Sequence, residues 1–170
     1  LKVVESVKVN ARGALSMKAI VVMFDLLNDN PAPYGNQWVH VTIFQRLAKR
    51  SVTFTNSYVG SMPCMPARRE QHTGRYPSQH GAWSLGTKLP EDELTAGEIF
   101  SKAGYKKALI GKVHFQPLAS TEENYSLESY PVMQDLDFWR TFHCSFYGFD
   151  YVQLACTYAD EPQVGQHYAI

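Results

Sequence analysis

The chain has 170 residues, of which 45% are apolar, and its 16 lysines and arginines balance 16 aspartates and glutamates. This length suffices for one domain with a sizeable core. The balanced charge excludes the basic footprint that nucleic-acid binding requires, so no nucleic-acid partner is expected. No apolar run is long enough to span a membrane, so no membrane association is expected.

The cysteine content and the N-terminal residues indicate the cellular compartment. Cys64, Cys144 and Cys156 are an odd number at unrelated spacings, which is typical of neither a disulfide framework nor a zinc site. Residues 1–16 have mixed charge and no apolar core, so they are not a secretory signal. A reducing, cytoplasmic location is therefore expected. Residues 1–16 are interpreted as a leader outside the domain, which is expected to occupy residues 17–170.

The first half of the domain begins with a strand pattern. Residues 18–24 form a continuous apolar run, which predicts a strand buried on both faces, as in a parallel sheet. Apolar side chains on one helical face predict a helix over residues 39–50. Alternating Val, Phe and Tyr predict a second strand over residues 51–58.

The second half continues the alternation. Thr95 and Glu98 form a capping box for a helix that Gly104 ends. Residues 107–110 and 150–155 are predicted strands, whereas residues 116–146 are aromatic and irregular. Residues 165–170 resemble the start of a helix. Strand and helix alternation predicts an α/β fold class with a parallel sheet, in which ligands bind at the carboxyl ends of the strands.

Cys64 begins the most informative stretch, Cys-Met-Pro-Ala-Arg. Pro66 suits the first position of a helix and Gly74 suits its end, which places Cys64 just ahead of the helix N-terminus. A thiol there, close to Arg68, would be reactive. A lone cysteine is more often a buried structural thiol. The thiolate phosphatase loop is absent, because it requires an arginine where this chain has Glu70.

Four further candidates are Asp25, Lys112 and His114, which follow predicted strand ends, and Arg68. Asp25 suits a hard divalent cation, although a carboxylate there more often caps a helix or turn. Lys112 and His114 are expected on the same side of an extended segment, where a cation and an imidazole suit an anionic ester. Arg68 lies one helical turn beyond Cys64 and can point back toward it.

Two of these motifs carry a family resemblance. Cys64-x-Pro66-x-Arg68 resembles the signature of sulfatases, and Gly111-Lys112-x-His114 resembles their second motif. The resemblance implies an alkaline phosphatase-like fold, a mostly parallel sheet flanked by helices, of which this chain would be an incomplete N-terminal portion. It also implies that a formylglycine-generating enzyme oxidises Cys64 to formylglycine, an aldehyde whose hydrate is the nucleophile.

The resemblance assigns roles to these residues. Asp25 and the modified Cys64 would ligate a divalent metal, expected to be Ca²⁺, although Leu26 stands where many members carry a second acid. Arg68 would hold the hydrate, and Lys112 and His114 would bind oxygens of a small-molecule or saccharide sulfate ester. One hydroxyl of the hydrate attacks sulfur and the alcohol leaves. Deprotonation of the second hydroxyl then expels sulfate and restores the aldehyde.

Other interpretations remain. The chain could be a phosphonate or phosphate ester hydrolase of the same superfamily, a non-catalytic relic that binds anions, or a generic α/β domain with a reactive thiol. Because sulfatases take further ligands from later segments, this stretch alone is expected to be inactive. Arg69 is expected at the surface, and His72 and Lys107 are expected to be structural. The tryptophans are expected in the core.

Overall fold

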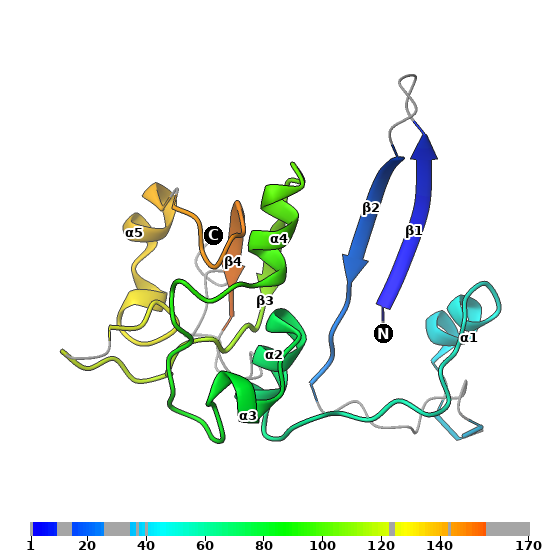
Figure 1. Ribbon diagram of the computed structural model, residues 1–170, viewed down its shortest axis with the longest axis horizontal. Coiled ribbons are helices and arrows are strands. Elements are labelled where there is room, and N and C mark those ends of the chain that lie inside the picture. Colours follow the sequence, from blue (N-terminus) through cyan, green and yellow to red (C-terminus); the bar gives the residue numbers. More distant parts are fainter. Residues whose placement is uncertain are drawn as a thin grey trace. The chain divides into compact units, whose positions relative to one another are not determined.

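The computed structural model describes residues 2–9, 15–25, 35–36, 38–39, 41–122, 125–142 and 144–155, with side chains described from residue 18 onward. The chain divides into two compact units, residues 1–58 and residues 59–170. Figure 1 labels the helices and strands of both units. Residues 165–170, where the sequence predicts the start of a helix, lie outside the described residues.

The described residues of the first unit form a hairpin and one short helix. Strands β1 (Lys2–Val9) and β2 (Leu15–Val21) pair antiparallel, and helix α1 (Thr42–Ala48) follows. The helix confirms the one expected over residues 39–50. The strand expected over residues 18–24 ends three residues earlier and belongs to a hairpin. The predicted leader boundary falls inside β2, and the extent of the domain stays a prediction.

Burial in this unit differs from the expectation. The prediction that residues 18–24 form a strand buried on both faces is wrong, since Val21 is 58% exposed and Phe24 is 49% exposed. A strand is buried on both faces only when layers cover both sides of its sheet, and a two-stranded hairpin provides no such layers. The strand expected over residues 51–58 is also absent, and Phe54 there is 71% exposed.

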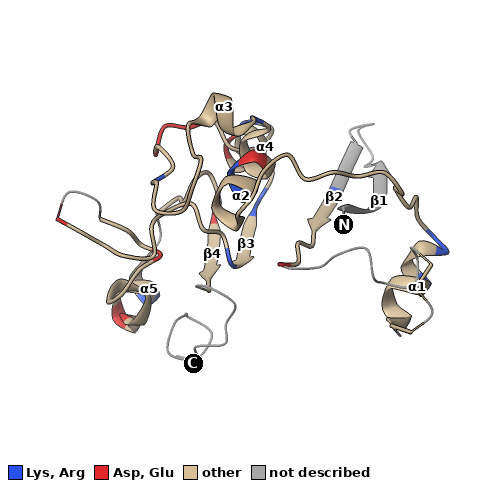
Figure 2. Cartoon of the chain, turned by 90° about the horizontal axis from the view of Figure 1, so that it is seen from below, with Lys and Arg blue, Asp and Glu red and all other residues tan. Residues whose placement is uncertain are grey.

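The second unit is α/β. Its elements, in chain order, are α2 (Cys64–Thr73), α3 (Pro77–His80), α4 (Ala96–Lys102), β3 (Ala108–Gly111), η2 (Val132–Gln134), α5 (Leu136–Thr141) and β4 (Tyr151–Leu154). Strands β3 and β4 pair in parallel, which confirms the last two predicted strands and the α/β class. Acidic and basic residues are interspersed along this unit (Figure 2).

Lys107 connects the starts of strands β3 and β4. Its ammonium group lies 2.9 Å from a carboxylate oxygen of Asp150 and donates to Ser101 Oγ at 2.6 Å. The backbone amide of Lys107 also donates to Asp150, at 3.0 Å. These bonds connect α4, the start of β3 and the start of β4, as expected for a structural residue.

Helix α4 is fixed at its start. Thr95 Oγ1 accepts a hydrogen bond from the Glu98 amide at 3.3 Å and donates to the Tyr147 carbonyl at 2.7 Å. This confirms Thr95 as the N-cap, which is the first half of the predicted capping box. A Cβ on Gly97 would lie 2.4 Å from the Tyr147 carbonyl oxygen, so only glycine permits this close approach. Gly104 follows the helix with a φ of 79°, as predicted.

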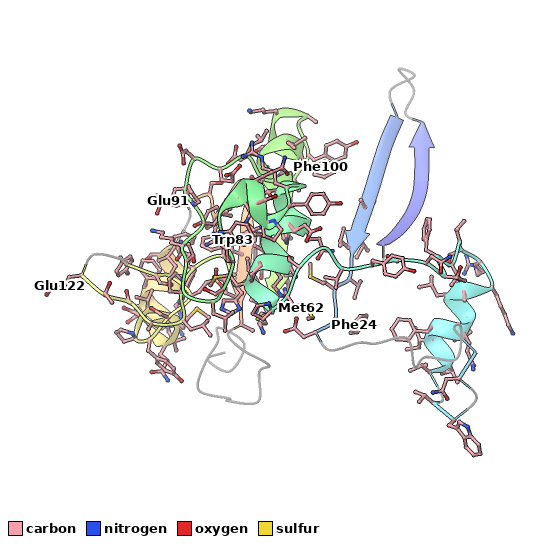
Figure 3. All side chains as sticks on the ribbon, turned by 60° about the horizontal axis from the view of Figure 1, so that its bottom comes forward. Phe24, Met62, Trp83, Glu91, Phe100 and Glu122 are labelled. Atoms are coloured by element: carbon pink, nitrogen blue, oxygen red, sulfur yellow. The ribbon has the colours of Figure 1, made fainter. Side chains whose placement is uncertain are left out.

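The core of the second unit is built largely by the irregular segments. Its buried apolar residues are Leu89, Val113, Phe115, Val132, Met133, Trp139, Phe146, Tyr147 and Leu154. The expectation that the tryptophans are core residues is correct for Trp139 and wrong for Trp38 and Trp83, which are 91% and 68% exposed. Trp83 is labelled among the side chains in Figure 3. In the described part of the chain, no helix has the length and apolar character needed to cross a bilayer.

Candidate functional site

Helix α2 sets the position of Cys64. The helix begins at Cys64 itself, with Pro63 as its N-cap, so the predicted start at Pro66 is wrong by two residues. Proline is accommodated at the third position because the amides of the first turn have no intrahelical acceptor. The unpaired amides of this turn still favour an anion near Cys64. Gly74 ends the helix in the left-handed conformation, as predicted.

Cys64 meets His114, which lies 50 positions later in the chain. The distance from Cys64 Sγ to His114 Nδ1 is 3.2 Å, within hydrogen-bonding range for sulfur. His114 is almost completely buried and Cys64 is partly buried. The packing of α2 against the segment after β3 therefore creates a sulfur–imidazole contact that neither motif specifies alone.

Arg68 makes a second link between the same two segments. It is buried one turn beyond Cys64, and its guanidinium group donates a hydrogen bond to the Lys112 backbone carbonyl. The pKa of His72 is lowered to about 4. Burial is the larger cause, and the positive charge of Arg68 is the second. Cys64, Arg68, Lys112 and His114 thus come together within the second unit.

The backbone around His114 differs from the expectation. His114 has a φ of 59°, in the left-handed region, so the extended conformation predicted for this segment does not continue through His114. The physical reason is that the amides from His114 onward turn toward a buried carboxylate, that of Glu128. The side chain of Lys112 is half-buried, whereas that of His114 faces Cys64.

Glu128 accepts three consecutive backbone amides. Its Oε2 lies 2.6 Å from the His114 amide nitrogen, and its Oε1 lies 2.7 Å from that of Phe115 and 3.0 Å from that of Gln116. Glu128 is 2% exposed. Burial raises the pKa of Glu128 to about 7, although the three amides and then Arg68 act in the opposite direction.

Arg69 is a buried structural residue. It is completely buried, and its guanidinium group donates to the backbone carbonyls of Thr87 and, at 3.1 Å, Phe115. The expectation of a surface arginine is therefore wrong, because these carbonyls need a donor inside the fold. Burial lowers the pKa of Arg69. His72 contacts the Phe115 ring edge to face, with centroids 4.8 Å apart, in agreement with its expected structural role.

The two predicted metal ligands belong to different units of the chain. Asp25 is in the first unit and Cys64 is in the second. Leu26 lies outside the described residues. Within the described ranges, no three His, Cys, Asp or Glu residues cluster so that they could hold a metal ion. The ligand roles of Asp25 and Cys64 stay predictions.

Two residues of this site were not found from the sequence. Glu128 lies in the irregular stretch between residues 116 and 146, where no periodicity or motif distinguishes one acid from another. Arg69 follows a motif arginine, and nothing in its neighbours signals that both are buried. Glu128 is recognisable only in the folded chain, because its contacts with the second motif span 12 to 14 positions.

Comparison with known proteins agrees with the motifs. The family model described as Sulfatase matches residues 19–162. The chain is 38% identical to human steryl-sulfatase over 107 residues, which cover 56% of this chain and 18% of that protein. It is 33% identical to the choline-sulfatase of Rhizobium meliloti (strain 1021) over 116 residues, covering 66% and 23% of the respective chains.

A third relative is the ulvan-active sulfatase of Formosa agariphila, 34% identical over 84 residues, which cover 49% of this chain and 17% of that enzyme. The chain spans less than a quarter of the length of these three relatives.

Proposed function

The chain belongs to the sulfatase family, and from this premise we propose that it supplies the nucleophile segment of an enzyme that hydrolyses sulfate esters. The proposed nucleophile is residue 64 after oxidation of Cys64 to formylglycine by a separate formylglycine-generating enzyme. The surrounding fold is proposed to be the alkaline phosphatase-like α/β fold of the family, of which the described second unit contains one parallel strand pair and its helices.

The observation that carries this proposal is the contact between Cys64 and His114. In formylglycine an oxygen takes the place of Sγ, so Sγ marks where a hydroxyl of the hydrated aldehyde would lie. At 3.2 Å, His114 Nδ1 is within reach to exchange a proton with that hydroxyl. Because His114 is buried, this exchange would be shielded from bulk water.

Arg68 supplies a fixed positive charge beside the nucleophile. Its guanidinium group is held by the Lys112 carbonyl, and such a charge stabilises the negative charge that develops on sulfate oxygens during attack. Lys112 is proposed to add a second cation toward the same ester. A fixed arrangement of donors is worth more than mobile ones, because nothing has to reorganise as the reaction proceeds.

A divalent metal belongs to the proposed active site. Ca²⁺ would supply Lewis-acid chemistry, with Asp25 and residue 64 as proposed ligands. The described residues do not gather a complete ligand set for such an ion. Since the matched stretch covers only 23% of the choline-sulfatase and 18% of the steryl-sulfatase, catalysis is proposed to need segments beyond those present here.

The substrate class is proposed to be a small-molecule or saccharide sulfate ester. The relatives carry the names choline-sulfatase, steryl-sulfatase, ulvan-active sulfatase and delta 4,5-hexuronate-2-O-sulfatase. Their organic portions differ widely, whereas the sulfate ester is common to all four names. The segment around Cys64, Arg68 and His114 is therefore assigned to the sulfate group, and not to the alcohol.

The test uses the complete protein, coexpressed with a formylglycine-generating enzyme. Rates on nitrophenyl sulfate and nitrophenyl phosphonate are compared in parallel. We expect faster hydrolysis of the sulfate, and we expect Cys64→Ala to abolish it while Cys144→Ala, at an exposed cysteine, leaves it unchanged. Faster hydrolysis of the phosphonate, or full activity of Cys64→Ala, would contradict the proposal.

A further inference from the structure

We propose that Glu128 is a positioning residue that holds the backbone of His114 so that its imidazole meets residue 64. The catalytic meaning of this role rests on the proposed function, whereas the contact itself exists in the unmodified protein. Glu128 belongs to neither family motif, and it bonds to the backbone of the residue whose imidazole contacts Cys64.

The first argument is the geometry of the carboxylate. Three consecutive amides, those of His114, Phe115 and Gln116, converge on its two oxygens at 2.6, 2.7 and 3.0 Å. Successive amides that converge in this way form an anion-binding concavity. Here the anion is a side chain of the same chain, so the concavity fixes its own backbone in place.

The second argument is the conformation that this carboxylate maintains. His114 has a φ of 59°, a region that residues with a Cβ rarely adopt. Such a conformation persists only where the surroundings determine it. The Glu128 bond to the His114 amide is made at that residue, and the imidazole that contacts Cys64 Sγ projects from the same Cα.

The third argument is that residues next to Glu128 form hydrogen bonds with the segment that follows His114. The Leu127 amide donates to Gln116 Oε1 at 2.6 Å, and Ser126 Oγ donates to the Pro117 carbonyl at 2.6 Å. The Glu128 amide in turn donates to Ser126 Oγ at 3.2 Å. The two segments therefore hold each other from both sides, which leaves the carboxylate little freedom to move.

A glutamine at position 128 tests the role of the second oxygen. Glu128→Gln keeps the shape of the side chain but replaces one acceptor by an amide NH₂. If the remaining oxygen stays with Phe115 and Gln116, the NH₂ group faces the amide of His114 and cannot accept from it. The substitution thus removes the acceptor of the His114 amide, together with the negative charge that Arg68 faces, and it retains the volume of the side chain.

The first experiment measures Cys64 in protein made without the maturation enzyme. Alkylation by iodoacetamide is followed by mass spectrometry of individual peptides, so Cys64 and Cys144 are read separately. We expect His114→Ala to change the Cys64 rate several-fold and Glu128→Gln to change it in the same direction. The double variant should match His114→Ala, and the rate at exposed Cys144 should stay constant.

The second experiment measures turnover of the matured complete protein on nitrophenyl sulfate. We expect Glu128→Gln to lower kcat about tenfold with little change in KM, since an effect on a transition-state contact appears in kcat. Combined with His114→Ala it should cause no additional loss. Glu91→Gln, which affects an exposed acid paired with Lys88, serves as the matched control and should retain full activity.

The outcomes separate the two proposals. Additive losses in the double variant, or a wild-type Cys64 alkylation rate in Glu128→Gln, would overturn the positioning role, whatever the turnover. Absence of turnover in every protein would contradict the proposed function and leave the alkylation result decisive for Glu128. If Glu128→Gln does not fold, Ser126→Ala removes the bond to Pro117 and should change Cys64 alkylation in the same direction. An unchanged rate in that variant would also overturn the proposal.

Discussion

Strongly apolar segments occur in both units, in residues 18–58 and in residues 59–155. Their side chains are mostly exposed to solvent in the first unit and mostly buried in the second. In the first unit Val21 and Phe54 are 58% and 71% exposed, and no described side chain of that unit is buried. In the second unit Val113 and Phe115 are buried, and they belong to a core that includes aromatic rings from the irregular segments.

The difference shows what an apolar pattern can and cannot specify. A run of Ile, Val and Phe gives a segment the capacity to be buried, whereas burial itself requires layers that cover it. In the second unit these layers come from helices and from irregular chain. The same core brings Cys64, Arg68 and His114 together, so the site depends on long-range packing in that unit.

The largest expected effect compares one phenylalanine from each unit. Phe115→Ala should lower the free energy of unfolding by about 3–5 kcal/mol, since the ring is completely buried and contacts His72, Phe146 and Tyr147. Phe54→Ala, at an exposed ring, should change it by less than about 0.5 kcal/mol. Urea unfolding of both variants measures the difference. Equal effects would show that the two units do not differ in packing.

The next effect concerns two buried titratable groups of the second unit. His72 has a pKa of about 4 against an ordinary 6.5, so its stabilisation is present above pH 6.5 and is lost as the pH falls toward 4. Glu128 has a pKa of about 7 against an ordinary 4.5, so its stabilisation is present below pH 4.5 and is lost as the pH rises toward 7. Each of these two pKa differences corresponds to about 3 kcal/mol of unfolding free energy.

These two dependences oppose each other between pH 4.5 and pH 6.5. In the wild-type protein we therefore expect unfolding free energy to vary little over this window. Glu128→Gln should lose stability as the pH falls, because the titration of Glu128 no longer opposes that of His72. His72→Gln should lose stability as the pH rises. Urea unfolding at intervals of pH checks both, and parallel curves for the two variants would refute the assignment.

The smallest expected effect concerns the cap of α4. Thr95→Ala removes a buried hydroxyl that bonds both the Glu98 amide and the Tyr147 carbonyl, and it should cost about 1–2 kcal/mol of unfolding free energy. Thr95→Ser keeps the hydroxyl and should recover most of this loss. A serine variant as unstable as the alanine variant would indicate that packing of the methyl group, and not the cap, matters.

The parts of the fold that the sequence predicted depend on local signals. Thr95 with Glu98 marks the start of α4, Gly74 marks the end of α2, and short apolar runs mark β3 and β4. These features are set by neighbouring residues and backbone preferences. The Cys64 and His114 motifs were likewise readable, because each fits within a few residues.

The parts that could not be predicted depend on contacts between distant segments. The left-handed conformation of His114 follows from Glu128, which lies 14 positions later with no periodic pattern between them. The burial of Arg69 depends on the carbonyl of Thr87, 18 positions away. The exposure of residues 18–24 depends on which strand they pair with, and a continuous apolar run does not specify a partner.

The most direct test of the central claim is the mass of the peptide that contains residue 64, from complete protein coexpressed with a formylglycine-generating enzyme. We predict the mass loss that accompanies conversion of a cysteine to an aldehyde at Cys64, with the peptides of Cys144 and Cys156 unchanged. An unmodified Cys64 in folded protein, under conditions that convert a known sulfatase in the same cells, would contradict the account.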